Sequence, residues 1–369
     1  VAEVPAIRAS PPMERFCQRA DGGDSEPEAA EFEFVPALRV RIVFFILAYG
    51  YPQNIGRLIL SLMPAAHHIL VHVDIKRPEY LKQLNSWVLD KGLSGIDVIA
   101  EHRVNRGGVS TLHAWLGGMS WLLQNVGAWD YYINLNDSDY PIASMTALKR
   151  FLWLNQGGNF INVGSAYKDC DCGRYLVFEC EDELYSIAPE LRYPRRPELH
   201  HASGPNLVAV SRAFASYVVG GLNSSGSPVE QIFRDLSILQ QPDEKFWQTA
   251  ALNSPFCRTH VRWSFHIWDR PGLAPDQASP EVAGPALKML SPPLLGERFL
   301  PRLEEVRGRR LSVFFARKFD NNRTAALQDM VDESNKGAVG SWRKLPAEMT
   351  AWLGAVLAAV LGVPAEIFG

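Results

Sequence analysis

A regular alternation of apolar runs and amphipathic segments across residues 42–142 constrains the fold of this chain most strongly. Residues 42–48 form a continuous apolar, β-rich run, which is typical of a strand buried on both faces. Further strands are predicted at 67–76, 96–102 and 130–142, and helices between them at 52–63, 79–90 and 110–126. This β-α-β order predicts an α/β fold with a mostly parallel, Rossmann-like sheet and helices on both faces.

Ligands of such sheets bind beyond the carboxyl ends of the strands. Four segments fall at that edge of the predicted sheet and are candidate binding segments. They are Ala48–Tyr49, Asp74–Lys76, the loop NRGGVS at 105–110 and DSDY at 137–140. After residue 155 the pattern is looser, with a strand and helix predicted over 206–219, a helix after Pro242, and a last strand within 311–320.

Composition excludes several classes of protein. The chain has 369 residues, 47% of them hydrophobic, which is enough for one large domain or two ordinary ones. Its formal charge of −3 gives no reason to expect nucleic acid or an anionic membrane as a partner. No stretch reaches the ~18 apolar residues of a membrane span; the nearest, at 349–363, is short and alanine-rich, as in a packed or terminal helix.

Five cysteines, at 17, 170, 172, 180 and 257, lack the spacing of a zinc site. One or two long-range disulfides and buried free thiols are both compatible with this number. The histidines also lack a metal-ligating spacing, and we assign none of them to a metal site.

Two neighbouring acids, Asp137 and Asp139, form a DxD at the end of a predicted strand. Carboxylate oxygens in such a pair can hold Mg²⁺ or Mn²⁺ on a diphosphate. The alternative is an Asx turn, in which the two aspartates accept from backbone N–H groups before Pro141. The pattern alone leaves both interpretations open.

A second pair of acids stands in QQPDEKFWQTAAL, at 240–252, where Asp243 and Glu244 follow Pro242. Proline at a helix start and acids in the first turn are common, because the acids complement the helix dipole. The functional alternative is a carboxylate held on a rigid helix facing a cleft, where it accepts a proton. Position alone favours the first interpretation.

Paired cations stand in FFARKF, where Arg317 and Lys318 end an apolar run. Adjacent side chains on a strand point to opposite faces, so one solvated cation and one ion pair are the simple expectation. If the strand ends there, both cations can reach one diphosphate. Asp74 can likewise accept from a uracil or ribose, or be an ordinary charged strand end.

Together these stretches resemble the branching glycosyltransferases, a family that includes peptide O-xylosyltransferases and core-2 β-1,6-N-acetylglucosaminyltransferases. The matching pieces include HVDIKRPEYLKQL, RGGVSTLHAWLGGMSWLL, WDYYINLNDSDYPI, YLVFEC, PDEKFWQTAALNSPFC and FFARKFD, in order from about 41 to 325. In the stretches WDYYINL, LNSPFC and FFARKF, the residues resemble those of the xylosyltransferases more than those of the N-acetylglucosaminyltransferases.

The resemblance implies a GT-A fold and inverting transfer from a UDP-sugar without a metal ion or other cofactor. By its motif, Glu244 is the general base, and Arg317 and Lys318 replace the metal on the diphosphate. Asp74 falls where the family contacts uracil, and Ala48, Lys76 and Arg106 line the same end. The resemblance further implies xylose from UDP-xylose as the sugar and a protein serine hydroxyl as the acceptor.

Some motifs depart from the family. Gly204-Pro-Asn206-Leu207 replaces a Gly-Ser-Asp-Trp stretch that faces the donor sugar, and Arg106 replaces a usual tryptophan. The donor sugar therefore stays open. A β-1,6-N-acetylglucosaminyltransferase acting on a glycan and a catalytically silent UDP-sugar or glycan-binding relative are the alternatives.

The expected organisation is a disordered stem at 1–38, a GT-A catalytic domain at 39–330 and a helical tail at 331–369. By resemblance, the full-length protein is expected in the lumen of the Golgi or endoplasmic reticulum. It would be a type II membrane protein, anchored through a segment that this sequence does not contain. The partners expected are a UDP-sugar donor and a protein or glycan acceptor.

Overall fold

The computed structural model describes residues 39–50, 52–164, 176–187, 199–268, 294–295, 299, 301–303 and 312–341. The expected stem at 1–38 lies outside these ranges, as do most of the Pro-rich segment after residue 270 and residues 342–369 of the expected tail. Within the described ranges, no helix combines the length and the apolar character that a bilayer span requires.

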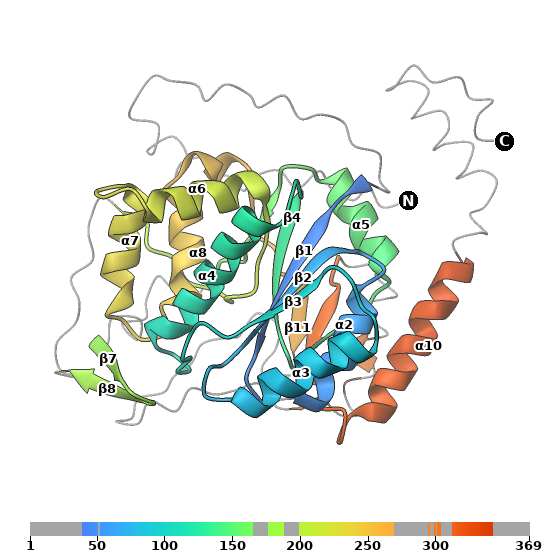
Figure 1. Cartoon of the computed structure of the whole chain (residues 1–369). Coiled ribbons are helices and arrows are strands. Elements are labelled where there is room, and N and C mark those ends of the chain that lie inside the picture. Colours follow the sequence, from blue (N-terminus) through green and yellow to red (C-terminus); the bar gives the residue numbers. More distant parts are fainter. Residues whose placement is uncertain are drawn as a thin grey trace, which may run out of the picture.

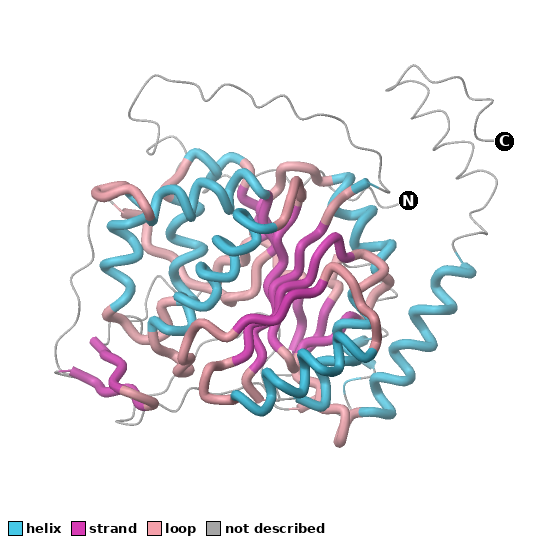
Figure 2. The backbone as a smooth tube through the Cα atoms, in the orientation of Figure 1, coloured by secondary structure: helices cyan, strands magenta, loops and turns pink. Residues whose placement is uncertain are grey.

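The central sheet has seven strands in the order β10-β6-β9-β4-β1-β2-β3 (Figure 2). The strands are β1 (Ile42–Ala48), β2 (Ala66–Val73), β3 (Ile96–Ile99), β4 (Tyr131–Asn136), β6 (Asn159–Phe160), β9 (Ala209–Ser211) and β10 (His260–Val261). Parallel pairs join β1 to β2 and β4, β2 to β3, and β6 to β10, whereas β9 is antiparallel to β4 and β6. The predicted fold class, α/β with a mostly parallel, Rossmann-like sheet, is confirmed.

Strand β1 lies inside the sheet, between β4 and β2, and all seven of its residues are buried. Successive side chains of a strand point to opposite faces, so a continuous apolar run needs cover on both. Phe44 packs into the core on one face, and Phe45 packs into the core on the other. The apolar run predicted from the sequence therefore becomes the shared wall of two hydrophobic cores.

Helices cover the two faces of the sheet (Figure 1). The core containing Phe45 is formed with α4 (Val109–Asn125), α6 (Arg212–Leu222), α7 (Pro228–Ser237) and α8 (Asp243–Leu252). The core containing Phe44 is formed with α2 (Pro52–Leu62), α3 (Pro78–Asp90) and α5 (Met145–Leu154). Helix α8, which carries the candidate base, is thus packed beside α4, whose first turn follows the NRGGVS loop.

A second sheet of three short strands lies at the end of β4. It has the order β11-β12-β5, with β5 (Asp139–Pro141), β11 (His266–Trp268) and β12 (Phe315–Arg317). Strand β12 is antiparallel to β5, and Arg317 pairs with Asp139. The strand expected within 311–320 is therefore only three residues long, because its antiparallel partner β5 is equally short. Lys318 follows the strand instead of continuing it.

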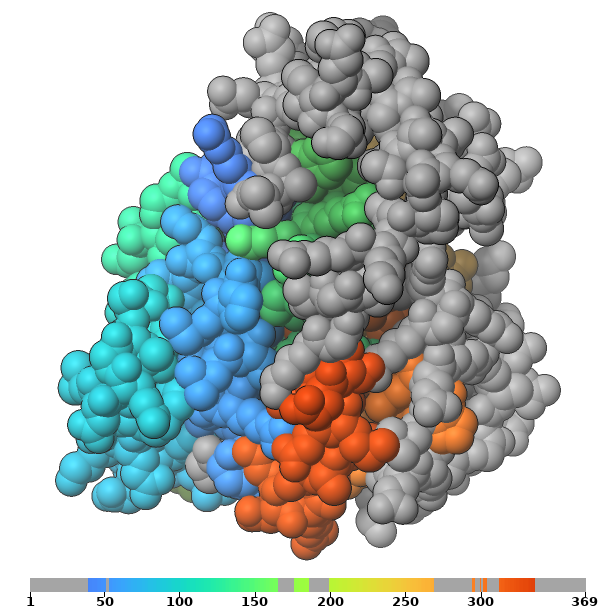
Figure 3. Space-filling model, turned by 90° about the vertical axis from the view of Figure 1, so that its right-hand side faces the viewer, coloured from blue at the N-terminus to red at the C-terminus, as the bar shows by residue number. Residues whose placement is uncertain are grey.

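Helix α10 (Ala325–Ser341) returns to the start of the fold and lies against the N-terminal elements (Figure 3). Arg57 on α2 donates to Asp329 and Asp332 of this helix, with both distances at 2.7 Å. The helix begins at Ala325, before the expected boundary at 331, and the proposed division into domains stays a prediction.

Candidate active site

Three neighbouring strands end at the same edge of the central sheet and build the floor of the site. The backbone N–H of Asp74, after β2, donates to the carbonyl of Ala48 at the end of β1, over 3.1 Å. The N–H of Asp137, after β4, donates to the carbonyl of Leu47, over 3.2 Å. Strand order reverses at β1, which is where ligands of open α/β sheets bind. Ala48 itself is fully buried, and its predicted contact with the nucleotide stays a prediction.

The two aspartates of the DSD segment are buried and bind groups of the protein. Oδ2 of Asp137 accepts from the N–H groups of Tyr49 and Gly50, both over 2.9 Å. Oδ2 of Asp139 accepts from Asn136 N–H over 2.8 Å, and its Oδ1 lies 3.3 Å from Nε of Arg317. Only the bond from Asn136 to Asp139 is local, whereas Asp137 binds the backbone of a distant segment and Asp139 also pairs with Arg317, so these contacts are not those of a simple Asx turn. In the described ranges, no three His, Cys, Asp or Glu side chains are grouped as a metal site.

Arg317 and Lys318 reach this edge from the second sheet. Arg317 is held by its ion pair with Asp139, while Phe319 N–H donates to the carbonyl of Ser138 over 2.8 Å. Lys318 between them is only 8% exposed. Burial, followed by the charges of Arg317 and Arg106, lowers the pKa of Lys318 to about 8. The fold therefore holds Arg317 and Lys318 directly beside the DSD turn.

Glu244 lies in the first turn of α8 and is half-buried. Its backbone carbonyl accepts from Gly204 N–H over 2.9 Å, which fixes the turn against the segment that follows residue 199. Burial and the neighbouring Asp243 raise the pKa of Glu244 to about 7, against the opposing charges of Lys245, Arg106 and Arg317. A carboxylate with a pKa near neutrality is suited to accepting a proton.

The other acid of the pair, Asp243, is sealed inside the protein. It is 5% exposed, and Nδ2 of Asn206 donates to its Oδ2 over 2.5 Å. Asn206 is held in turn by Asn134 of β4, whose Nδ2 donates to the Asn206 carbonyl over 2.8 Å. Burial raises the pKa of Asp243. Of the two acids that start α8, Asp243 is a structural partner of Asn206, whereas the pKa of Glu244 is influenced by the charges of Arg106 and Arg317.

Sequence reasoning missed Lys245, which is also buried. Its ammonium donates to the carbonyl of Gln240, and to that of Gln241 over 3.0 Å. Gln241 has φ of 51°, a left-handed conformation that is uncommon outside glycine. Lys245 therefore holds the turn that leads into Glu244. The one sequence signal for this role was a lysine beside the apolar residues of α8. Asn134, a polar residue inside strand β4, was a similar signal for the bond to Asn206.

Asp74 and Lys76 form one polar unit at the end of β2. Oδ1 of Asp74 accepts from Lys76 N–H over 2.9 Å, and its Oδ2 lies 3.6 Å from the Lys76 ammonium. The ammonium also donates to the carbonyl of Val104 and to Oδ1 of Asn105, both over 2.9 Å. Lys76 thus links Asp74 to the NRGGVS loop. The predicted contacts of Asp74 and Lys76 with the nucleotide stay predictions.

Arg106 is exposed on the NRGGVS loop. The next residue, Gly107, accepts from Gln241 N–H over 2.8 Å, which joins this loop to the turn before Glu244. The charge of Arg106 acts on Glu244, Lys318 and Tyr49. The resemblance grouped Arg106 with Ala48 and Asp74, and the fold brings it near Arg317 and Lys318 as well.

Tyr49 was noted in the sequence as part of a candidate segment but was given no role. Burial and the charge of Asp137 raise its pKa to about 12, although Arg317 and Arg106 oppose the rise. The phenol therefore stays protonated at neutral pH and is able to donate a hydrogen bond. An isolated Tyr-Gly after a strand carries no specific signal for such a role.

Several known proteins have sequences similar to this chain. "Xylosyltransferase oxt" of Drosophila pseudoobscura pseudoobscura is 29% identical over 246 residues, which cover 63% of this chain and 27% of the fly protein. "Xylosyltransferase 1" of Homo sapiens is 28% identical over 272 residues, covering 69% of this chain and 27% of the human protein. "Xylosyltransferase 2" of Homo sapiens is 27% identical over 320 residues, covering 79% of this chain and 33% of that human protein. The chain therefore spans about a third or less of the length of these relatives.

A family model places the chain in a wider group. The model of the "Core-2/I-Branching enzyme" family matches residues 42–288. This match runs from the first strand of the central sheet, through the DSD turn and the candidate base, to beyond β11. It covers well over half of the chain. Five of the seven predicted site residues, from Ala48 to Glu244, lie within it, and the cation pair Arg317 and Lys318 follows it. The chain belongs to the Core-2/I-branching enzyme family.

Proposed function

We propose that this chain is an inverting, UDP-sugar-dependent glycosyltransferase of the xylosyltransferase type, which transfers a sugar to a serine hydroxyl of a protein. The observation that carries the proposal is the placement of Glu244. A half-buried carboxylate with a pKa raised to about 7 by burial and Asp243 stands within the electrostatic reach of Arg106 and Arg317. The site thus combines a proton acceptor with fixed positive charge, which are the two needs of a metal-independent transfer from a nucleotide sugar.

The proposed reaction is a single displacement. Glu244 takes the proton of the acceptor hydroxyl as the oxygen attacks the anomeric carbon from the side opposite UDP. The bond between that carbon and the β-phosphate oxygen breaks, and UDP leaves with the bonding electron pair. Arg317 and Lys318 neutralise the charge that develops on the β-phosphate. Asp74, Lys76 and Ala48 would line the uridine end, where β1 and β2 finish.

The identity of the sugar has a second candidate, because the segment at 204–207 departs from the xylosyltransferases. Asn206 donates to Asp243, and Leu207 is 2% exposed, so neither offers the acid and indole expected beside xylose. Transfer of N-acetylglucosamine to a glycan is the alternative. A UDP-release assay with UDP-xylose, UDP-GlcNAc, UDP-GlcA and UDP-Glc, each with peptide and glycan acceptors, discriminates the two. Absence of release with every pair would support a binding protein without activity.

Activity is expected to survive excess EDTA. The reason is that Asp137 and Asp139 direct oxygens at backbone N–H groups and at Arg317, while the two cations stand where a metal would neutralise the diphosphate. Asp137→Asn, which keeps an acceptor oxygen for Tyr49 and Gly50, should retain activity as well. Loss of turnover on chelation and recovery with Mn²⁺ would instead establish the DSD segment as a metal site.

The kcat/KM for the donor is expected to follow a narrow bell-shaped pH profile. Glu244 must be deprotonated to accept a proton, and burial with Asp243 raises its pKa to about 7. Lys318 must be protonated to neutralise the diphosphate, and burial with Arg317 lowers its pKa to about 8. Activity should therefore fall below the first value and above the second.

Lys318→Arg is the matched variant for the basic limb, because arginine stays charged throughout this range. It should move the basic limb to higher pH and leave the acidic limb in place. An acidic limb near the ordinary glutamate value of 4.5 would show that the base is not Glu244. An unmoved basic limb would show that it does not report Lys318.

The compartment is also part of the proposal. Cys257 is disulfide-bonded, while Cys180 is a free, exposed thiol. Disulfides persist in oxidising compartments, which supports action in the lumen of the Golgi or endoplasmic reticulum. Fractionation of cells that express the full-length protein, with protease protection of the lumenal domain, tests this assignment.

A further inference from the structure

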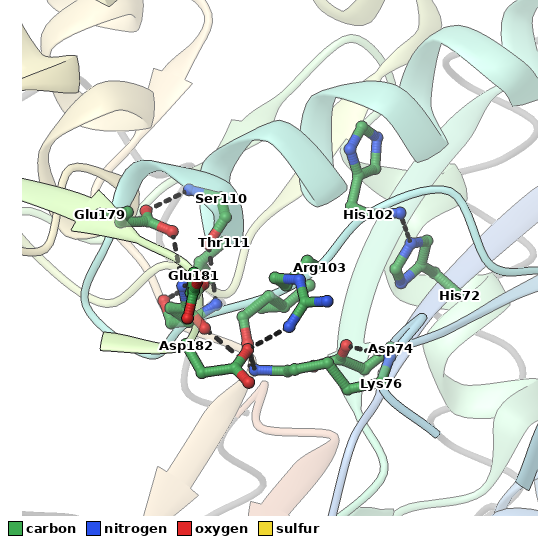
Figure 4. Close-up of polar contacts among 12 residues, drawn as sticks. His72, Asp74, Lys76, His102, Arg103, Ser110, Thr111, Glu179, Glu181 and Asp182 are labelled. Carbon is green, nitrogen blue, oxygen red and sulfur yellow. Dashed lines mark hydrogen bonds and ion pairs between the residues drawn. The ribbon is translucent and has the colours of Figure 1, made fainter. Parts of the chain in front are cut away.

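A two-stranded hairpin, β7 (Leu176–Cys180) and β8 (Glu183–Ile187), lies outside both larger sheets. At its start, Val177 N–H donates to the carbonyl of Ile238 over 2.9 Å, and Leu176 forms an isolated bridge with Leu239. These contacts fall immediately before the turn that leads into Glu244. The other end of the hairpin contacts the NRGGVS loop (Figure 4). The hairpin therefore touches both segments that meet at the reaction centre.

The carboxylate of Glu179, on β7, binds the two ends of the NRGGVS loop. Its Oε1 accepts from Ser110 N–H over 2.7 Å, and its Oε2 accepts from Nδ2 of Asn105 over 3.1 Å. Helix α4 begins directly after Gly108, which has no side chain to cap it. Glu179 supplies that cap from a distant part of the chain, and its charge complements the N-terminal end of the helix dipole.

The second glycine of the loop is explained by this contact. A Cβ atom on Gly108 would lie 2.0 Å from Oε1 of Glu179, so only glycine leaves room for the carboxylate. The sequence placed this loop among the candidate ligand-binding segments. At Gly108 the group that approaches is a side chain of the protein itself.

Asn105 carries the contact onward to the predicted nucleotide end. It is 5% exposed, and its Nδ2 donates to Glu179 and also to the carbonyl of Glu181 over 2.9 Å. Its Oδ1 accepts from the Lys76 ammonium, which is paired with Asp74. Asp182, at the tip of the hairpin, pairs with Arg103 over 2.5 Å. Figure 4 shows the hairpin, the loop and the end of β2 joined by this network.

Arg106 lies inside the segment that the hairpin fixes. Glu179 holds Asn105 on one side of it and Ser110 on the other, while Gly107 accepts from Gln241 in the turn before Glu244. We propose that Glu179 is a positioning residue, which holds the Arg106 loop in register with Asp74 and with the turn that carries Glu244. The hairpin would then link donor binding to the placement of the base. This inference rests on the proposed function.

The experiment is a double-mutant cycle between Glu179 and Arg106, read in kcat and KM for the donor. Glu179→Ala removes two charge-assisted hydrogen bonds, so kcat/KM should fall about 10-fold to 100-fold. In the Arg106→Ala background, the same change should cost only a few-fold, because the residue through which Glu179 acts is already gone. Glu183→Gln, which removes an exposed carboxylate from the same hairpin, is the matched control and should behave like the wild type.

Glu179→Gln serves as a second variant if the alanine variant folds poorly. It keeps the size of the side chain, and its oxygen can still accept from Ser110 N–H, but its NH2 group then meets the Asn105 donor, so an intermediate loss is expected. Equal losses in both backgrounds would mean that Glu179 stabilises the fold without acting through Arg106, and the inference would be wrong. Kinetics like those of the wild type in both Glu179 variants would also overturn it.

Hydrogen exchange separates failure of this inference from failure of the proposed function. The amide of Ser110 should exchange faster in Glu179→Ala than in the wild type, whether or not the protein transfers a sugar. If the wild type releases no UDP but this amide loses protection, the loop is held as described and the proposed function fails. If the protection of this amide is unchanged, the positioning role fails independently of any activity.

Discussion

Replacing Glu244 by glutamine is expected to lower turnover by about 10²–10⁴, the usual contribution of a positioned general base. The amide keeps the size of the side chain but cannot take the proton of the acceptor hydroxyl. The backbone bond from Gly204 to the Glu244 carbonyl does not depend on the side chain, so the first turn of α8 should stay in place. Binding of UDP, measured by calorimetric titration, should change little.

Asp243→Asn is the matched control for this prediction. It changes the adjacent acid, which takes no part in the proposed reaction. Asp243 instead accepts a hydrogen bond from Asn206. Its charge contributes to the raised pKa of Glu244, so its removal should shift the acidic limb of the pH profile downward. Turnover of Glu244→Gln close to the wild-type rate would end the assignment of the base and would leave the acid pair as an ordinary helix start.

Replacing Lys318 by alanine is expected to lower kcat by one to two orders of magnitude even at saturating donor. Charge-assisted hydrogen bonds contribute roughly 1.5–3 kcal/mol, and negative charge on the β-phosphate grows as the bond to the sugar breaks. An interaction that strengthens in the transition state affects kcat as well as KM. Steady-state kinetics beside calorimetric titration with uridine and with UDP measure the two effects separately.

Uridine binding should be nearly unchanged in this variant, because Asp74 lies at the end of β2 and not on the second sheet. Lys318 is a cleaner target than Arg317. Removing Arg317 would leave Asp139 buried without its ion pair, which would destabilise the fold as well as the site. If Lys318→Ala binds UDP and turns over like the wild type, the cations do not replace a metal in this protein.

Elements with strong periodicity could be predicted from the sequence. The apolar run at 42–48 and the helices that follow it appear as expected, because burial of one central strand dictates its composition. The second sheet could not be predicted as a sheet, since strands of three residues such as β5 and β12 carry no periodic signal. Hairpin β7–β8 was likewise missed, although its first strand falls within YLVFEC, one of the matching pieces.

The roles of individual site residues depended on contacts between distant parts of the chain. The sequence left Asp137 open between a metal ligand and a turn, and its bonds to Tyr49 and Gly50 join positions nearly ninety residues apart. The choice between Asp243 and Glu244 required Asn206, which lies on another segment. Local pattern selects the residue types of the site, whereas the fold decides which of their atoms are already bound within the protein.

The bond between Asn206 and Asp243 has a consequence for protein engineering. An aspartate introduced at 206, to restore the acid expected beside xylose, would place two carboxylates at the 2.5 Å now spanned by the amide and Asp243. Like charges this close cannot both ionise, so one acid would have to stay protonated. Because Asp243 also affects the pKa of Glu244, a change at residue 206 that alters the donor preference would alter proton transfer as well. A change of sugar would therefore require replacing residues 206 and 243 together.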